Sequence, residues 1–201
     1  MQLLESYINT VETSGLDPLV KMALVHHQFE SIHPFSDGNG RIGRILNVLF
    51  LTQQNLLDVP VLYLSRFITQ NKAEYYRLLQ STRENGHWEP WILFMLRAVH
   101  ETSMQSTWLI GQIKDLMAET KNRMRNNHSK IYSQDLINNL FRHPYTRIEY
   151  LVDEVGVGRQ TAARHLNELV SGGLLEKVRQ GANNYYINRP LAELLIKGFG
   201  E

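Results

Sequence analysis

The stretch from His33 to Arg44 constrains this chain more than any other, because it places several anion-handling residues at one loop-to-helix junction. Gly38 and Gly40 flank Asn39, and these residue types adopt a positive φ at low cost, so that consecutive backbone N–H groups can turn toward an anion. Apolar residues follow at helical spacing and predict a helix beginning near residue 41. The first N–H groups of such a helix lack helical partners and favour negative charge. The junction therefore predicts a phosphate-binding site. The apolar residues at this spacing are Ile42, Ile45, Leu46, Leu49 and Phe50.

The charged residues of the stretch suit phosphate-transfer chemistry. Arg41 and Arg44 lie three apart and share a helix face, where guanidinium groups bind phosphate oxygens. Asp37 is placed to hold Mg²⁺, which usually takes one or two protein carboxylates together with substrate phosphates. His33 carries an imidazole, which can take a proton from an attacking hydroxyl at neutral pH. Each residue alone is more often structural, whereas their joint occurrence favours a catalytic site for nucleotide phosphates.

At these positions the chain resembles the Fic family, whose motif reads His-x-Phe-x-Asp/Glu-Gly-Asn-Gly-Arg-x-x-Arg and is matched at every specified position from His33 to Arg44. Residues 24–32 resemble the helix that leads into this motif, and the later residues resemble family members that carry a winged helix. The resemblance implies a mainly α fold, with a Fic-type helical core followed by a small α+β winged helix-turn-helix domain. Fic enzymes typically transfer AMP from ATP to a Ser, Thr or Tyr hydroxyl, so the resemblance implies a protein adenylyltransferase that uses Mg-ATP and acts on a target protein or on itself.

The resemblance also gives each motif position a role. His33 would be the general base, and Asp37 would bind Mg²⁺. Arg44 would hold the γ-phosphate and so align the α-phosphorus for in-line attack. Tyr75 and Tyr76 match a tyrosine pair that lines the nucleotide pocket in the family, although amphipathic helix packing explains either tyrosine taken alone. The remaining residues expected to bind the nucleotide are Gly38, Asn39, Gly40, Arg41, Ile42 and Gly43.

Two features of the family are not recognisable in the sequence. A β-hairpin flap usually precedes the motif helices and clamps the target by strand addition, but residues 1–10 already have the pattern of a core helix. The inhibitory pattern Ser/Thr-x-x-x-Glu-Gly/Asn is approached by residues 81–85, whose spacing is one residue short. We therefore expect either that these parts belong to a longer protein or that this control is lacking.

Three other functions stay open. A kinase of the Doc type shares the fold but binds ATP in the reverse orientation, and such kinases generally have Lys where this chain has Gly40. A DNA-binding regulator could use the core as a nucleotide sensor, or carry it as an inactive remnant that lacks the flap. Some Fic proteins remove AMP from a modified target with the help of a regulatory Glu, which this sequence does not reveal.

The composition limits the number of domains and the cellular compartment, but it does not identify a binding partner. A length of 201 residues suits one or two domains with a real core, and the formal net charge of +1 favours no class of ligand. The absence of cysteine excludes disulfides and thiol catalysis and suits a reducing compartment. No apolar run approaches the roughly 20 residues of a membrane span, and no signal peptide is visible. We therefore expect a cytoplasmic protein without a membrane partner, and a homodimer is left open.

Local signals place several helix ends in the first part of the chain. Asp17 before a proline predicts a helix start, and Asp58 before Val-Pro predicts the end of the motif helix. Asn71 and Glu74 predict a capping box, and Gly86 predicts the end of the helix that follows it.

We expect residues 1–120 to form the catalytic core, residues 121–130 a basic linker and residues 131–201 a winged helix. Two short amphipathic helices around a Gly-Val-Gly turn predict a helix-turn-helix, and apolar strands around Gly181 predict a hairpin, or wing. Basic residues barely outnumber acidic ones in this part, which is a weak electrostatic signal for DNA, and winged helices also bind proteins. The candidate contacts to DNA or a protein partner are Arg159, Gln160, Arg164, Lys177 and Arg179.

Overall fold

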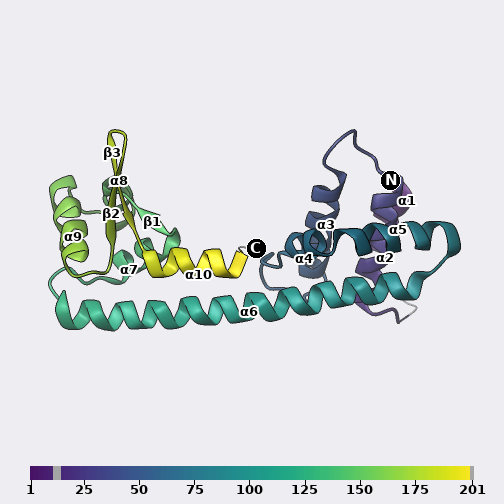
Figure 1. Cartoon of the computed structure of the whole chain (residues 1–201), viewed down its shortest axis with the longest axis horizontal. Coiled ribbons are helices and arrows are strands. Elements are labelled where there is room, and N and C mark those ends of the chain that lie inside the picture. The colour runs from purple at the N-terminus through teal and green to yellow at the C-terminus, as the bar shows by residue number, and fades with distance from the viewer. Residues whose placement is uncertain (11–14, 200–201) are drawn as a thin grey trace. The chain divides into compact units, whose positions relative to one another are not determined.

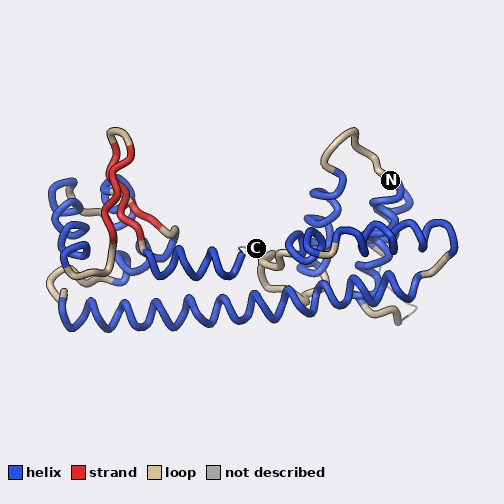
Figure 2. The backbone as a smooth tube through the Cα atoms, in the orientation of Figure 1, coloured by secondary structure: helices blue, strands red, loops and turns tan. Residues whose placement is uncertain are grey.

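The structure, a computed structural model, describes residues 1–10 and 15–199 and divides into two compact units, Met1–Ser106 and Thr107–Glu201. The helices are α1 (Gln2–Asn9), α2 (Pro18–Ile32), α3 (Asn39–Gln53), α4 (Leu64–Gln70), α5 (Lys72–Asn85), α6 (Trp88–Asn127), α7 (Gln134–Arg142), α8 (Ile148–Val155), α9 (Arg159–Ser171) and α10 (Arg189–Phe199) (Figure 1). The strands are β1 (Tyr145–Thr146), β2 (Glu176–Gln180) and β3 (Asn183–Ile187) (Figure 2). The predicted fold class, mainly α with a small α+β part, is confirmed.

The first unit is built around an aromatic core. Trp91 of α6 is fully buried, and its Nε1 donates a hydrogen bond of 2.9 Å to the carbonyl of Ala23 in α2. Phe94 and Phe67 pack at 5.3 Å between ring centroids, and Tyr75 lies 5.5 Å from Trp91. Because buried aromatic side chains remove large apolar areas from water, this cluster fixes the positions of the helices that carry the predicted site.

Two of the predicted helix ends are confirmed. The Asp17 carboxylate caps α2 by accepting a hydrogen bond of 2.7 Å from Leu19 N–H. Gly86 ends α5 in the left-handed conformation with φ +68°, which glycine adopts without a Cβ penalty.

Two other predictions at helix ends are wrong. The motif helix ends at Gln53, before Asp58, because Asn55 takes a φ of 56° and Leu56 N–H donates back to the carbonyl of Leu51 at 2.9 Å. The capping box at Asn71 is absent from the described structure, because α4 ends directly before α5 and the Asn71 amide donates to the carbonyl of Phe67 at 2.9 Å. Glu74 instead forms an ion pair of 2.7 Å with Arg97.

The expected linker at 121–130 is largely helical. Helix α6 runs without a break from Trp88 to Asn127, so residues 121–127 form its last turns. Met124, within these turns, is fully buried in the core of the second unit. The assignment of residues 1–120 to the catalytic core and of residues 131–201 to a winged helix stays a prediction.

The second unit contains the predicted helix-turn-helix and hairpin. Helices α8 and α9 are joined through Gly156, whose φ is +74°, and their buried faces meet at Leu151 and Leu166. Strands β2 and β3 pair antiparallel from Glu176 opposite Ile187, and β1 adds a short third strand, giving the order β1-β3-β2. In Figure 1 the hairpin projects beside α8 and α9, as the wing of a winged helix does. Among the described residues, none of the helices combines the length and apolarity that crossing a membrane requires.

Candidate active site

His33 ends α2 in an uncommon backbone conformation. Its φ is 50° and its ψ is 58°, and its N–H donates to the carbonyl of Phe29 at 3.0 Å. Residues other than glycine rarely adopt the left-handed region, and those that do often lie at functional sites, where surrounding contacts hold them. The backbone of His33 therefore marks this position independently of the side-chain chemistry.

The loop after His33 is closed by the side chain of Asn39, which is 2% exposed. Its Oδ1 accepts from Phe35 N–H at 2.9 Å, and its Nδ2 donates to the Phe35 carbonyl at 2.6 Å. Gly38 then begins α3 with φ 84°, and Ile42 N–H makes a 3.0 Å bond to its carbonyl. The N–H groups of residues 39–41 precede that first helical bond, so they are the donors that an anion at a helix N-terminus uses.

The two motif arginines lie in different surroundings. Arg41 Nη2 is 3.3 Å from Asp37 Oδ2, and both side chains are largely exposed, so the pair adds little stability. Arg44 is half-buried, and its Nε donates to Ser65 Oγ at 2.8 Å, which orients the guanidinium. Asp37 thus presents one accessible carboxylate, a donor that fits Mg²⁺ when phosphates and water complete the shell. Among residues 1–10 and 15–199, no group of at least three His, Cys, Asp or Glu converges as a metal site.

A cavity of about 680 Å³ brings five of the predicted site residues together. This volume is within the range of small-molecule sites. Among the residues predicted from the sequence, it is lined by His33, Gly40, Arg44, Tyr75 and Tyr76. The lining residues that the sequence analysis missed include Glu30, Lys72, Gln80 and Arg83. Since Lys72, Tyr76, Gln80 and Arg83 follow one another at three- and four-residue spacing on α5, the helical period was the signal that could have found them.

The other predicted nucleotide-binding residues lie outside this lining. Arg41 lines a neighbouring groove of about 460 Å³, which shares Arg44 with the cavity. Gly38 and Asn39 shape the loop described above, and Ile42 is 37% exposed. Gly43 is buried against α2. The nucleotide contacts of these residues and of Asp37 stay predictions.

Residues 1–51 match the model of the Fic/DOC family, and residues 116–191 match a model described as the C-terminal domain of the SoFic-like protein adenylyltransferase. The chain thus carries a segment of the Fic/DOC family near its start and a segment similar to the SoFic-like C-terminal domain further along. The Fic motif read from the sequence thus lies inside the first matched segment, and the helix-turn-helix and the hairpin lie inside the second.

Relatives named protein adenylyltransferase Fic include one from Drosophila virilis, 28% identical over 61% of this chain and 24% of the relative. Another, from Drosophila willistoni, is 31% identical over 56% of this chain and 21% of the relative. This chain thus spans about a quarter of the length of these curated relatives. A solved structure of a Fic family protein from Desulfovibrio desulfuricans G20 is 23% identical and covers 92% of this chain and 53% of that chain, with a TM-score of 0.47.

Behind the Fic motif, α2 buries two titratable side chains beside the cavity. His26 is fully buried, stacks on Trp91 with 6.0 Å between centroids, and has its Nε2 3.0 Å from the Tyr75 hydroxyl. Burial lowers the pKa of His26 to about 4, so it is neutral at physiological pH. Burial raises the pKa of Glu30, while the nearby charges of His33 and Arg44 oppose that rise. The cavity therefore has one neutral imidazole beside it and one buried acid in its lining.

Gly43 sets how closely α2 and α3 of the Fic core approach. A Cβ at this position would lie 2.5 Å from Glu30 Oε1 and 3.1 Å from His26 Cε1. We expect Gly43→Ala to lower the free energy of unfolding by about 1–3 kcal/mol, because overpacking outweighs the better helix propensity of alanine. Urea unfolding followed by tryptophan fluorescence measures this change.

Gly111 is the matched control, because it also lies inside a helix. A Cβ there would meet open space among the described residues, so Gly111→Ala should raise stability by about 0.5–1 kcal/mol. A Gly43→Ala protein as stable as the parent would show that α2 and α3 do not meet so closely at this position.

Proposed function

We propose that this chain is a protein adenylyltransferase, which transfers AMP from Mg-ATP to a Ser, Thr or Tyr hydroxyl of a target protein. The observation that carries the proposal is the cavity in which His33, in its strained backbone conformation, lies with Arg44 beside the first turn of α3. The names of the relatives support the same activity. A cytoplasmic location, where ATP is abundant, is part of this proposal.

The cavity has the charge balance that a nucleotide triphosphate requires. Three cations, Arg44, Lys72 and Arg83, line it with one acid, Glu30. The free N–H groups at the start of α3 add the positive end of the helix dipole. The rings of Tyr75 and Tyr76 contact each other edge to face, with 5.2 Å between their centroids. These rings supply an aromatic surface on which the nucleobase can pack. When bound, Mg²⁺ held by Asp37 would neutralise phosphate charge.

In the proposed reaction, the target hydroxyl attacks the α-phosphorus, the bond to the leaving pyrophosphate breaks, and His33 takes the hydroxyl proton. The adjacent Glu30 has an electrostatic part in this step, because an ionised carboxylate stabilises the imidazolium that forms. Arg44, fixed by Ser65, would hold the outer phosphate and so keep the phosphorus in line. Positioning and charge stabilisation provide most of the acceleration in such transfers.

The alternative of a Doc-type kinase is disfavoured by the surroundings of Gly40. A Cβ at this position would lie 3.2 Å from Arg44 Nη1. A lysine, which such kinases have here, would therefore crowd the Arg44 guanidinium, which would have to shift. This observation favours AMP transfer over phosphate transfer.

The deciding experiment compares two labels. The chain is incubated with Mg²⁺ and ATP labelled at either the α- or the γ-phosphorus, in the presence of a protein extract that supplies hydroxyl targets. We expect label on protein from α-labelled ATP alone, and its loss when EDTA removes Mg²⁺. Label from γ-labelled ATP would assign the kinase reaction, and release of AMP from premodified protein would assign the reverse activity.

A further inference from the structure

Helix α9 presents a polar stripe on the side opposite its buried face. Ala162, Leu166 and Leu169 are buried in the core of the second unit. The stripe consists of Gln160, Arg164, Asn167 and Ser171, all exposed and spaced three or four residues apart. Side chains at this spacing point in one direction, so the stripe can contact a single extended partner.

The wing lies directly beside this stripe. Lys177 Nζ of β2 donates to Asn167 Oδ1 at 3.3 Å, and the Tyr186 hydroxyl of β3 donates to the same oxygen at 3.4 Å. The Lys177 ammonium also lies over the Tyr186 ring, 5.5 Å from its centroid. The stripe and the wing therefore form one surface. We call this surface the basic face; its cations are Arg147, Arg159, Arg164, Lys177 and Arg179.

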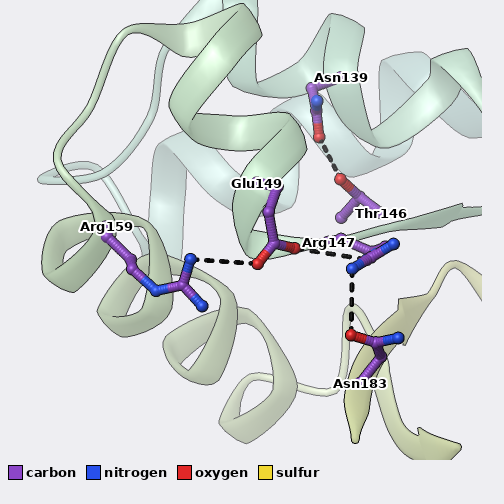
Figure 3. A network of polar contacts seen from close by, with 6 residues as sticks. All are labelled: Asn139, Thr146, Arg147, Glu149, Arg159 and Asn183. Carbon is purple, nitrogen blue, oxygen red and sulfur yellow. Dashed lines mark hydrogen bonds and ion pairs between the residues drawn. The ribbon is translucent and has the colours of Figure 1, made fainter.

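A chain of polar contacts holds part of the basic face in place (Figure 3). Arg159 Nη1 at the start of α9 is 3.2 Å from Glu149 Oε1, and Glu149 Oε2 is 3.3 Å from Arg147 Nε. Arg147 Nη2 in turn donates to Asn183 Oδ1 of the wing at 3.2 Å. The first turns of α8 and α9 are thus linked to the wing. Because these side chains are already held in place, less conformational entropy is lost when a ligand binds.

Three acidic residues near the helix-turn-helix and the hairpin are paired with cations outside the basic face. Glu154 is paired with Arg142 at 3.0 Å, Glu168 with His128 at 3.1 Å, and Glu176 is bonded to Arg189. On α8, Glu149 contacts two arginines of the face, and Asp153 follows it by one helical turn. The five cations of the basic face therefore meet few acidic side chains on that face, apart from Glu149 and its neighbour Asp153.

We propose that the basic face binds duplex DNA, with α9 in the major groove and the wing along the adjacent phosphates. The major groove admits an α-helix, and Arg and Gln side chains on such a helix can reach base edges, as Arg164 and Gln160 would. Arg147, Lys177 and Arg179 are placed for phosphate oxygens. This binding is separate from AMP transfer, because the residues involved belong to the second unit.

Fluorescence anisotropy of the whole chain with a labelled random-sequence duplex tests the proposal. We expect micromolar binding at low salt, with log K falling against log salt at a slope of about −3 for roughly three neutralised phosphates. The double variant Arg164→Ala/Arg179→Ala should bind at least about tenfold more weakly and lower the slope by about one to two.

Lys114→Ala/Lys130→Ala is the matched control, because it removes two exposed cations of the same unit outside the basic face. It should bind as the parent does, and circular dichroism should show both doubles folded. The proposal would be overturned if both double variants lost DNA affinity equally, or if the parent protein did not bind DNA at low salt. If DNA binding is absent and the first double instead loses labelling of target proteins, the face serves a protein partner. Retained self-labelling by that double would leave the adenylyltransferase assignment intact.

Discussion

Replacing His33 should reduce the rate of AMP transfer by about 10²–10⁴-fold, the range that a general base contributes. In the proposed reaction the target hydroxyl loses its proton to this imidazole, and Glu30 is the acid of the cavity lining that stabilises the resulting charge. The initial rate of label incorporation from α-labelled ATP measures the loss. The nucleotide affinity, read from the anisotropy of a fluorescent ATP analogue, should change less than about threefold, since Arg44 and the start of α3 remain.

The choice of substitution matters because His33 has a φ of 50°. Alanine is strained in this region, whereas asparagine tolerates it, so His33→Asn removes the base and keeps the backbone. We expect His33→Asn to be as inactive as His33→Ala but as stable as the parent. His100→Ala, at an exposed position on α6, is the control and should retain activity. Undiminished labelling by His33→Asn would eliminate the proposed general base.

The second large effect is a loss of stability in acid that depends on His26. Because burial lowers the folded-state pKa of His26 to about 4, the unfolded chain binds a proton from about pH 6.5 downward and the folded chain does not. The stabilisation is complete above about pH 6.5 and is lost as the pH falls through about 4. Between pH 7 and pH 4 it amounts to about 3 kcal/mol of unfolding free energy.

Other groups titrate in the same window, so the effect must be isolated with a variant. Burial also lowers the pKa of His27, which adds a loss of the same sign, whereas the raised pKa of Glu30 acts in the opposite direction. We therefore compare urea unfolding of the parent with that of His26→Gln at both pH values. The stability advantage of the parent over the variant should shrink by about 3 kcal/mol on acidification. An advantage that stays constant with pH would mean that the folded state does not lower the pKa of His26.

The elements that the sequence predicted well have strong local signals. The helix-turn-helix and wing followed from apolar spacing and from glycines such as Gly156 and Gly181, both of which take a positive φ. The Fic motif was readable because its residues are consecutive and lie on one loop and one helix turn.

The buried face of α3 was not predictable in the same way. Ile45 and Leu49 are 58% and 54% exposed, while Asn47 is fully buried. Apolar spacing indicated the helix correctly, but the residues that meet α2 are selected by how closely the two helices approach at Gly43. Similarly, Asn71 resembled an N-cap, yet its amide completes the preceding helix α4, which the sequence analysis missed.

The cavity's additional charges were also hidden from the sequence. Glu30 looks like an ordinary surface acid in the approach to the motif, but it is buried, and within the described chain its Oε1 accepts no hydrogen bond. Lys72 and Arg83 are far from the motif in sequence and reach the cavity only because α5 packs across it. Tertiary packing, which no single local pattern encodes, decides which of many charged residues meet.

Helix α6 limits where the second unit can be cut when a gene fusion moves it into another protein. Its last turns place Met124 in the core of the second unit, and His128, just beyond them, pairs with Glu168 of α9. A gene fusion that began the second unit at residue 131 would omit Met124, which is part of the hydrophobic core of that unit. Shuffling of this module among proteins must therefore carry the second half of the helix with it, as does the matched C-terminal segment that begins at residue 116.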